Sequence, residues 1–382
     1  MSSKFTGAAC PIFRTIDDEW IVAGTKNLSD TTLVDIDLTG LSIRWAEVQL
    51  DATTLFVGCT LPLELELKLR GRGANFLHAP TGLPYRPLRR NLYTWRELMD
   101  GYGEELDNST DIRIYHHFEG AKRCPSMNEA LWQRLHDFSI DEGLRRLLRF
   151  GSDGLPKRKV VGFMGGHGTG RDTDDYKTSL RTAKRLAEAG YFVASGGGPG
   201  IMEAANLGAY LAGVNDDELE WVFATLADAP TYRDPGFQAA AFKILDRFPD
   251  GTESLAIPTW FYGHEPSNLF ATYIAKYFSN SIREDTLLAI ALYGIVYAPG
   301  SAGTTQEIFM DAAQNHYVTF DFISPMVFLG GKRYTEDTQL FPLITDLAKG
   351  RAYADYLHLT DEPADVVAFI DAHPPLYVTT DG

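Results

Sequence analysis

The feature that most constrains this chain is a glycine-rich turn between an apolar run and a helical segment. Residues 287–297 form an apolar run that predicts a buried strand, and residues 308–314 have the pattern of a helix. The turn between them reads APGSAGTTQE over residues 298–307. Such a turn exposes backbone N–H groups and the positive end of the helix dipole, which suits it to binding a phosphate. A lone turn of this kind is a weak signal, because a tight strand–helix connection needs the same residues.

Two more units of the same kind occur earlier in the chain. Residues 191–195 predict a strand, which is followed by the turn GGGPG and by a helix that opens with IMEAAN. Residues 160–164 predict another strand, which is followed by GGHGTG. In an open parallel sheet, such turns gather at the carboxyl ends of the strands, where ligands bind. The three units predict an α/β fold with a doubly wound, mostly parallel Rossmann-like sheet and helices on both faces.

Residues 213–373 outside the glycine turns predict further strands and helices of the same fold. We expect an irregular region over residues 213–251, a strand at 254–258 and a helix at 268–280. Further on, we expect a strand at 326–329, a helix at 340–348 and a last strand–helix pair over 356–373.

The two later glycine turns resemble the two signature motifs of the LONELY GUY (LOG) family. The matching sequences are GGGPGIMEAAN at residues 196–206 and PGSAGTTQE at residues 299–307. The family, long labelled as lysine decarboxylases, includes cytokinin-activating phosphoribohydrolases and bacterial nucleoside 5′-monophosphate nucleosidases. The resemblance extends over residues 159–373. It departs from the family at Ser301, which replaces the second glycine of the PGGxGT turn and fits only if its backbone avoids a glycine-only conformation.

The resemblance implies hydrolysis of a nucleoside 5′-monophosphate to a free base and ribose 5-phosphate, with no cofactor and no metal. Arg283 and Glu307 match the family's catalytic pair, in which Glu307 would hold the ribose hydroxyls or the attacking water and Arg283 would orient it. An oxocarbenium-like centre needs such a carboxylate beside the ribose. Glu284 follows Arg283 where the family commonly has lysine, so the match of Arg283 rests on its spacing to Pro299. A surface ion pair with Glu284 or Asp285 is the alternative for Arg283. For Glu307 the alternative is simple pairing with the helix dipole.

Substrate and phosphate binding are expected from the glycine turns and their neighbours. These residues are Gly300, Gly303, Thr304, Thr305, Gly197, Gly198, Gly200, Met202, Glu203, Gly166 and His167, with Thr169 beside them. Glu203 either contacts the sugar or pairs with the helix dipole. His167 either donates a proton to the leaving base or is a polar surface group. His264 and Glu265 follow a strand end, where they would recognise the base or shape the loop.

Composition excludes several classes of function. The chain has 382 residues, of which 45% are hydrophobic, so it can bury a sizeable core. Its net charge of −16 disfavours binding to nucleic acids and to anionic membranes. Its three cysteines are widely spaced, and its first residues lack the apolar stretch of a signal peptide, so we expect a cytoplasmic protein with reduced thiols. The family resemblance implies a homodimer or a larger homo-oligomer.

The N-terminal part carries no catalytic pattern. We expect a β-rich domain over residues 1–120, a helical connector over 121–156 and the nucleotide-binding domain over 157–382. Leu33, Leu38, Ile43 and Val48 recur every five residues, which is neither a helical nor a strand period. This pattern is typical of a pentapeptide-type β-coil, and ordinary short strands are the alternative.

Three alternative functions differ from the nucleosidase in chemistry. A nucleotide sensor of the same fold would bind without cleaving, but it would not require both Arg283 and Glu307. A dinucleotide oxidoreductase would need GxGxxG spacing, which GGHGTG at residues 165–170 lacks. A pyridoxal phosphate decarboxylase would need a Schiff-base lysine beside the phosphate site, and neither signature motif has a suitable one.

Overall fold

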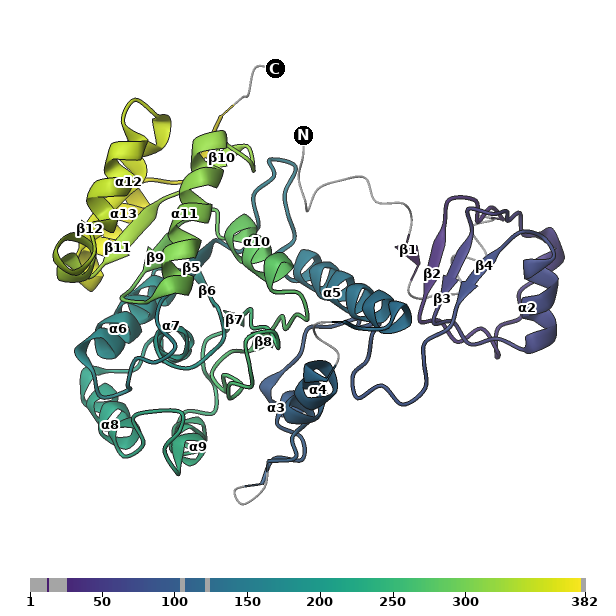
Figure 1. Cartoon of the computed structure of the whole chain (residues 1–382), viewed down its shortest axis with the longest axis horizontal. Coiled ribbons are helices and arrows are strands. Elements are labelled where there is room, and N and C mark those ends of the chain that lie inside the picture. Colours follow the sequence, from purple (N-terminus) through teal and green to yellow (C-terminus); the bar gives the residue numbers. More distant parts are fainter. Residues whose placement is uncertain (1–11, 14–25, 104–106, 121–123, 379–382) are drawn as a thin grey trace. The chain divides into compact units, whose positions relative to one another are not determined.

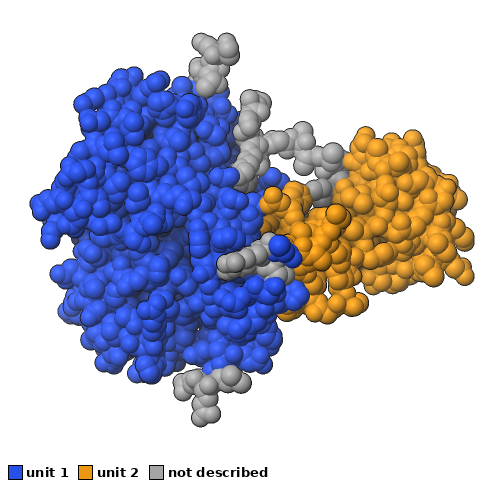
Figure 2. Space-filling model, viewed as in Figure 1, with its two compact units in different colours: residues 1–6, 91–124, 140–382 blue, residues 7–90, 125–139 orange. Residues whose placement is uncertain are grey.

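The structure is a computed structural model, and it describes residues 12–13, 26–103, 107–120 and 124–378. The chain divides into two compact units (Figure 2). The larger consists of residues 1–6, 91–124 and 140–382, and the smaller of residues 7–90 and 125–139. This division cuts across the expected segments 1–120 and 121–156, because residues 91–124 pack with the C-terminal part and one boundary falls inside helix α5 (Met127–Leu148).

A seven-stranded parallel sheet forms the centre of the larger unit (Figure 1). Its strand order is β12-β11-β9-β5-β6-β7-β8. The strands are β5 (Val160–Met164), β6 (Phe192–Ser195), β7 (Leu255–Ala256), β8 (Tyr273–Ile274), β9 (Ile295–Tyr297), β11 (Met326–Leu329) and β12 (Leu357–Thr360). From β5 the chain builds outward through β6 to β8, then returns to β9 on the other side of β5. This reversal between β5 and β9 is the switch point at which doubly wound sheets bind ligands.

Helices cover both faces of the sheet, which confirms the predicted doubly wound α/β fold. They are α6 (Asp174–Glu188), α7 (Ile201–Tyr210), α8 (Asp216–Ala227), α9 (Phe237–Arg247), α10 (Asn280–Ile290), α11 (Ala302–Tyr317), α12 (Leu340–Ala348) and α13 (Pro363–Ala372). Val161 and Phe163 of β5 point into the core shared with α6, α7 and α13. Gly162, between them, faces the opposite side, where an added Cβ would lie 3.1 Å from the Cβ of Ala291 at the end of α10. Both faces are therefore buried, which is why the strands are apolar throughout.

Three expected elements differ from the observed ones. The run 287–297 is shared between the end of α10 and the short strand β9, because an apolar run of this length fits a buried helix as well as a strand. Residues 268–279 contain β8 and no helix, and α10 begins only at Asn280, where the expected helix was to end. The region 213–251 is mostly helical, because it holds α8 and α9, and α8 buries Leu219, Val222, Phe223 and Leu226 at helical spacing.

The smaller unit is built on four parallel strands, β1 (Ile12–Phe13), β2 (Thr32–Val34), β3 (Leu55–Val57) and β4 (Asn75–Leu77), with α2 (Leu63–Arg70) between the last two. The register pairs Thr32 with Leu55 and Leu55 with Asn75, so successive strands are offset by 23 and 20 residues. Leu33, Leu38 and Val48 are buried in one core, and Ile43 packs against it. The strands stack in parallel, and the side chains that recur every five residues point into one core, which favours the β-coil interpretation.

Residues 91–124 extend the larger unit at the β8 edge. Tyr93 and Ile274 exchange two backbone hydrogen bonds of 2.9 Å in an antiparallel bridge. The short helix α3 (Trp95–Leu98) and helix α4 (Thr110–Glu119) follow this bridge. At the other end of the chain, β10 (Phe322–Ile323) and β13 (Leu376–Tyr377) form a separate antiparallel pair. Short 3₁₀ turns at Trp45–Glu47 and Ala352–Tyr356 and a π-helical turn at Arg333–Asp337 complete the elements.

Candidate functional site

The three glycine turns lie side by side at the carboxyl ends of β5, β6 and β9. The Gly166 N–H donates to the Pro299 carbonyl over 3.0 Å, and the Ile201 N–H donates to the Gly166 carbonyl over 3.1 Å. Gly200 has a φ of +68°, and a Cβ there would lie 2.3 Å from the Gly166 oxygen. Only glycine fits both the backbone conformation and the close approach. The turns after the three strands therefore form one continuous surface.

A cavity of about 590 Å³ opens over this surface. It is lined by most of the residues that the sequence singles out, namely Gly166, His167, Gly197, Gly198, Met202, His264, Glu265, Arg283, Gly303, Thr304 and Glu307. Thr169 and Gly200 instead line a neighbouring cavity of about 190 Å³, together with His167. Gly300, Thr305 and Glu203 line neither of these cavities. The structure thus brings Arg283, Glu307 and parts of all three turns to one place.

Arg283 and Glu307 form a buried ion pair in this cavity. Arg283 lies in the first half of α10, and its Nη1 is 3.3 Å from Oε1 of Glu307 on α11. The guanidinium is fixed from two other sides, because Nε donates to the Ile257 carbonyl over 2.7 Å and Nη2 to the Gly196 carbonyl over 3.4 Å. The exposed fractions of Arg283 and Glu307 are 8% and 9%, so both are held in place but still reach the cavity.

Burial controls the protonation of Glu307. Desolvation raises the pKa of its carboxyl above the usual value, the Arg283 charge lowers it, and the charge of Glu284 raises it again. Glu284 is itself buried and accepts hydrogen bonds from Asn280 Nδ2 over 2.7 Å and from Gln306 Nε2 over 2.8 Å. Arg283 therefore pairs with Glu307 inside the cavity, and not with Glu284 at the surface. A carboxylate with a raised pKa is a stronger proton acceptor than an exposed one.

The phosphate turn is shorter than the sequence suggests. Helix α11 begins at Ala302, so Gly303, Thr304 and Thr305 lie in its first turn. Ser301 precedes the helix with a φ of −112°, a conformation open to any residue, which explains how serine replaces the family's glycine. The first N–H groups of a helix have no partner within it, so those of Gly303 and Thr304 remain available to an anion.

Gly300 and Thr305 support this turn and do not face the cavity. The Gly300 carbonyl accepts a hydrogen bond from Arg333 Nη2 over 2.5 Å, and a Cβ on Gly300 would lie 2.1 Å from the Thr304 hydroxyl. The Thr305 hydroxyl donates to the Ser301 carbonyl over 3.0 Å. The expected phosphate contact from the Thr305 hydroxyl is therefore replaced by a bond within the helix.

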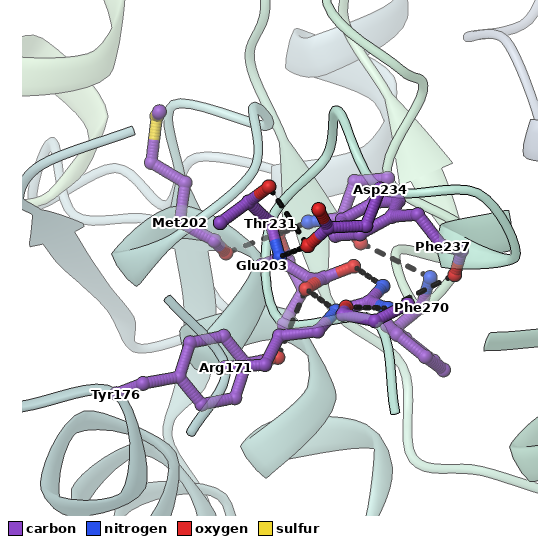
Figure 3. Close-up of polar contacts among 11 residues, drawn as sticks. Arg171, Tyr176, Met202, Glu203, Thr231, Asp234, Phe237 and Phe270 are labelled. Carbon is purple, nitrogen blue, oxygen red and sulfur yellow. Dashed lines mark hydrogen bonds and ion pairs between the residues drawn. The ribbon is translucent and has the colours of Figure 1, made fainter. Parts of the chain in front are cut away.

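Glu203 does not line the cavity, which corrects the expected contact with the sugar. Its Oε1 and Oε2 accept hydrogen bonds of 2.6 and 2.8 Å from Arg171, and Oε2 accepts another of 2.9 Å from the Tyr176 hydroxyl (Figure 3). Arg171 also donates to the Phe237 carbonyl over 2.9 Å and lies 3.4 Å from the centre of that residue's ring. This buried network ties the start of α9 to α7 and leaves Glu203 no free face.

A second buried ion pair lies at the cavity, and sequence reasoning missed it. Asp111 of α4 accepts hydrogen bonds of 2.7 and 2.8 Å from Lys276 Nζ, which lines the cavity. Trp260 Nε1 and Ser267 Oγ donate to the same carboxylate, each over 2.7 Å. No local motif marks this pair, because its partners are 165 positions apart in the chain.

The surroundings of Asp111 and His264 determine the direction in which each pKa is shifted. Burial raises the pKa of Asp111, but the Lys276 ammonium, His264 and the hydrogen bond from Ser267 more than offset this, and the pKa lies below its usual value. Burial lowers the pKa of His264, whose Nε2 is 3.9 Å from Asp111. At neutral pH an ionised Asp111 therefore lies behind Lys276 and beside a neutral His264, and both of these partners line the cavity.

Comparison with known families locates the resemblance on the first part of this sheet. A family model described as "SLOG cluster4 family" matches residues 158–214. This stretch contains β5, α6, β6 and α7 with the two turns that follow the strands. The resemblance to LOG-type Rossmann-like proteins is confirmed. The SLOG-type segment ends well before Arg283 and Glu307, and no curated protein matches the chain.

Several solved structures match the chain at low identity and with low TM-scores. The molybdenum cofactor carrier protein of Chlamydomonas reinhardtii matches with 16% identity over 56% of this chain and 97% of its own, with a TM-score of 0.35. The molybdenum cofactor binding protein of Rippkaea orientalis matches with 15% identity over 56% and 97%, with a TM-score of 0.37. DNA processing protein A of Streptococcus pneumoniae matches with 13% identity over 72% and 98%, with a TM-score of 0.31.

The described residues contain no cluster of three or more histidine, cysteine, aspartate or glutamate side chains placed to hold a metal ion. Among the helices they form, none combines the length and the apolar character needed to cross a bilayer.

Proposed function

We propose that this protein hydrolyses the N-glycosidic bond of nucleoside 5′-monophosphates. The products are a free base and ribose 5-phosphate. The observation that carries the proposal is the buried Arg283–Glu307 pair, which lies at the switch point of the sheet in a cavity lined by the glycine turns. A sugar phosphate bound there has an anion site at one end and a carboxylate beside it.

The residues divide the chemistry between them. The phosphate binds the N–H groups at the start of α11, including those of Gly303 and Thr304. This places the ribose beside Glu307, whose carboxylate holds the attacking water and stabilises the positive charge that develops at C1′. The water oxygen bonds to C1′ as the C1′–N bond breaks. One water proton passes to Glu307, the departing base takes a proton from solvent, and Glu307 then releases its proton to solvent.

Arg283 keeps Glu307 in position and in the ionised form. Its charge opposes the rise in the pKa of Glu307 that burial causes. The pKa remains above the usual value for glutamate, so the carboxylate accepts a proton more readily than an exposed one would. Hydrolysis should accordingly fall as the pH drops through this raised pKa.

The test uses the full-length protein with AMP, GMP, CMP, UMP and a cytokinin monophosphate, with free base measured by chromatography. At least one substrate should be cleaved, and Glu307→Gln should reduce the rate by roughly 10²- to 10⁴-fold, the range for removal of a general base. Glu220→Gln is the matched control, because Glu220 of α8 forms an exposed pair with Arg181 of α6 away from the cavity, and it should retain the rate.

Binding experiments separate catalysis from simple recognition. Glu307→Gln should still bind the nucleotide, because the glycine turns and the start of α11 are unchanged. If the wild-type protein binds nucleoside monophosphates but releases no base from any of them, the hydrolase proposal fails and a nucleotide sensor takes its place.

A further inference from the structure

The Asp111–Lys276 pair has no part in the proposed reaction, although Lys276 lines the cavity. Asp111 and Lys276 are only 1% and 3% exposed. Burial of two charges is costly, and ion pairs of this kind often contribute little to stability compared with apolar side chains of the same size. The position of the pair in a ligand cavity therefore raises the question of what Lys276 does there.

Lys276 retains a hydrogen-bond donor for a ligand. An ammonium group has three N–H donors. Within the described part of the chain, its two hydrogen bonds both go to the Asp111 carboxylate, over 2.7 and 2.8 Å. The charge also lies 5.2 Å from the centre of the Trp260 ring. Because Asp111 is held by Trp260 and Ser267 as well, it fixes the ammonium from one side and leaves the third N–H directed elsewhere.

The place of Lys276 in the cavity indicates which part of a nucleotide it meets. The phosphate end is set by the start of α11, and the ribose by Glu307. Lys276 lies in the chain segment beyond Tyr262, His264 and Glu265, and all four line the cavity. His264 and Glu265 are the residues for which the sequence offers base recognition, with loop structure as the alternative. The Nε2 atom of His264 lies 3.9 Å from the Asp111 carboxylate that holds Lys276, so a base contacted by His264 would be the part of the ligand nearest to Lys276.

We propose that Lys276, oriented by Asp111, selects nucleotides whose base carries a carbonyl oxygen. This inference rests on the proposed binding of nucleoside monophosphates. A carbonyl oxygen accepts the free N–H of the ammonium, as in hypoxanthine or guanine. The amino group of adenine stands at the same ring position and offers donors, which leaves the ammonium unpaired. Asp111 is a positioning residue, and Lys276 is the specificity-determining one.

The sharpest comparison is between IMP and AMP, which differ at that ring position. Wild-type protein should favour IMP by roughly 10- to 100-fold in kcat/KM and in Kd, the range for a hydrogen bond to a charged group. Lys276→Met should reduce this preference to about unity. Because that variant leaves Asp111 buried without its counter-charge, it is expected to be unstable. The double variant Asp111→Asn with Lys276→Met removes both charges and should recover thermal stability without recovering the preference.

Thermal stability and the preference for IMP over AMP together distinguish a structural role of the ion pair from a role in selecting the base. A merely structural pair would give a double variant that is stable and discriminates IMP from AMP as the wild type does, and that result would overturn the proposal. A wild-type protein without a preference for IMP would also overturn it. Kd values measured in the E307Q background do not depend on cleavage, so a preference in binding supports the role of Lys276 even if the hydrolase proposal fails.

Discussion

Replacing Gly196 by alanine tests whether the position of Arg283 governs the site. An added Cβ would lie 2.3 Å from Nη2 of Arg283 and 2.6 Å from Sδ of Met202. Ordinary contact begins at 3.4 Å, so Arg283 must retreat by about 1 Å or more. Since its bond to Glu307 is already 3.3 Å long, this movement breaks the pair.

The expected effects are modest for folding and large for catalysis. Crowding of two flexible side-chain ends costs about 1–3 kcal/mol in the free energy of unfolding, measured with urea. A displacement of about 1 Å in a catalytic group costs on the order of 10²-fold in rate. Because the Arg283 charge lowers the pKa of Glu307, its withdrawal raises that pKa. The acid side of the pH–rate profile should then move to higher pH.

Gly40→Ala is the control for the alanine substitution itself. A Cβ on Gly40 meets nothing within 4 Å, and Gly40 lies in the smaller unit, so rate and pH profile should not change. If folded Gly196→Ala hydrolyses nucleotides at the wild-type rate with an unshifted profile, Arg283 does not control Glu307 and the argument for the pair is wrong.

Further predictions concern stability and binding. Burial raises the pKa of Asp311 to about 7. The stability that its protonation provides is therefore fully present below about pH 4 and is lost as the pH rises through about 7, by up to about 4 kcal/mol. In urea unfolding, the free energy of unfolding of Asp311→Asn should rise relative to that of the wild type between pH 5 and pH 8, and a constant difference between the two proteins would contradict this. Arg171→Met should cost about 3–5 kcal/mol in unfolding free energy because it leaves Glu203 buried without its partner, and adding Glu203→Gln should recover part of the loss. Gly303→Ala should stabilise α11 by up to about 1 kcal/mol, because its Cβ meets nothing within 4 Å, yet weaken nucleotide binding measured by calorimetry because the methyl group stands at the phosphate site.

The fold could largely be predicted from its strand–turn–helix units. β5, β6 and β11 end where the apolar runs and glycine turns indicate, because a buried parallel strand is apolar on both faces. The errors occurred where this signal is ambiguous. The apolar residues of α10 continue almost directly into β9, so the sequence does not mark the boundary between them.

The candidate site was predictable where neighbouring residues carry the signal. The family resemblance predicts Arg283 and Glu307 as a pair, and the structure brings them into one cavity. Glu203 shows the limit of that reasoning, because its position at a helix start says nothing of Arg171, which arrives from another loop. Long-range pairs of this kind are set by tertiary packing, and a single sequence does not encode them in any local pattern.

The bridge between Tyr93 and Ile274 bears on how this protein should be shortened for study. A fragment that starts at the SLOG-type segment would omit α4 and with it the carboxylate that neutralises Lys276. Such a fragment would expose the outer edge of β8 to other chains and would bury an ammonium without its counter-ion. Any truncation meant to retain the complete cavity therefore has to begin before residue 91, upstream of the part that family resemblance alone would select.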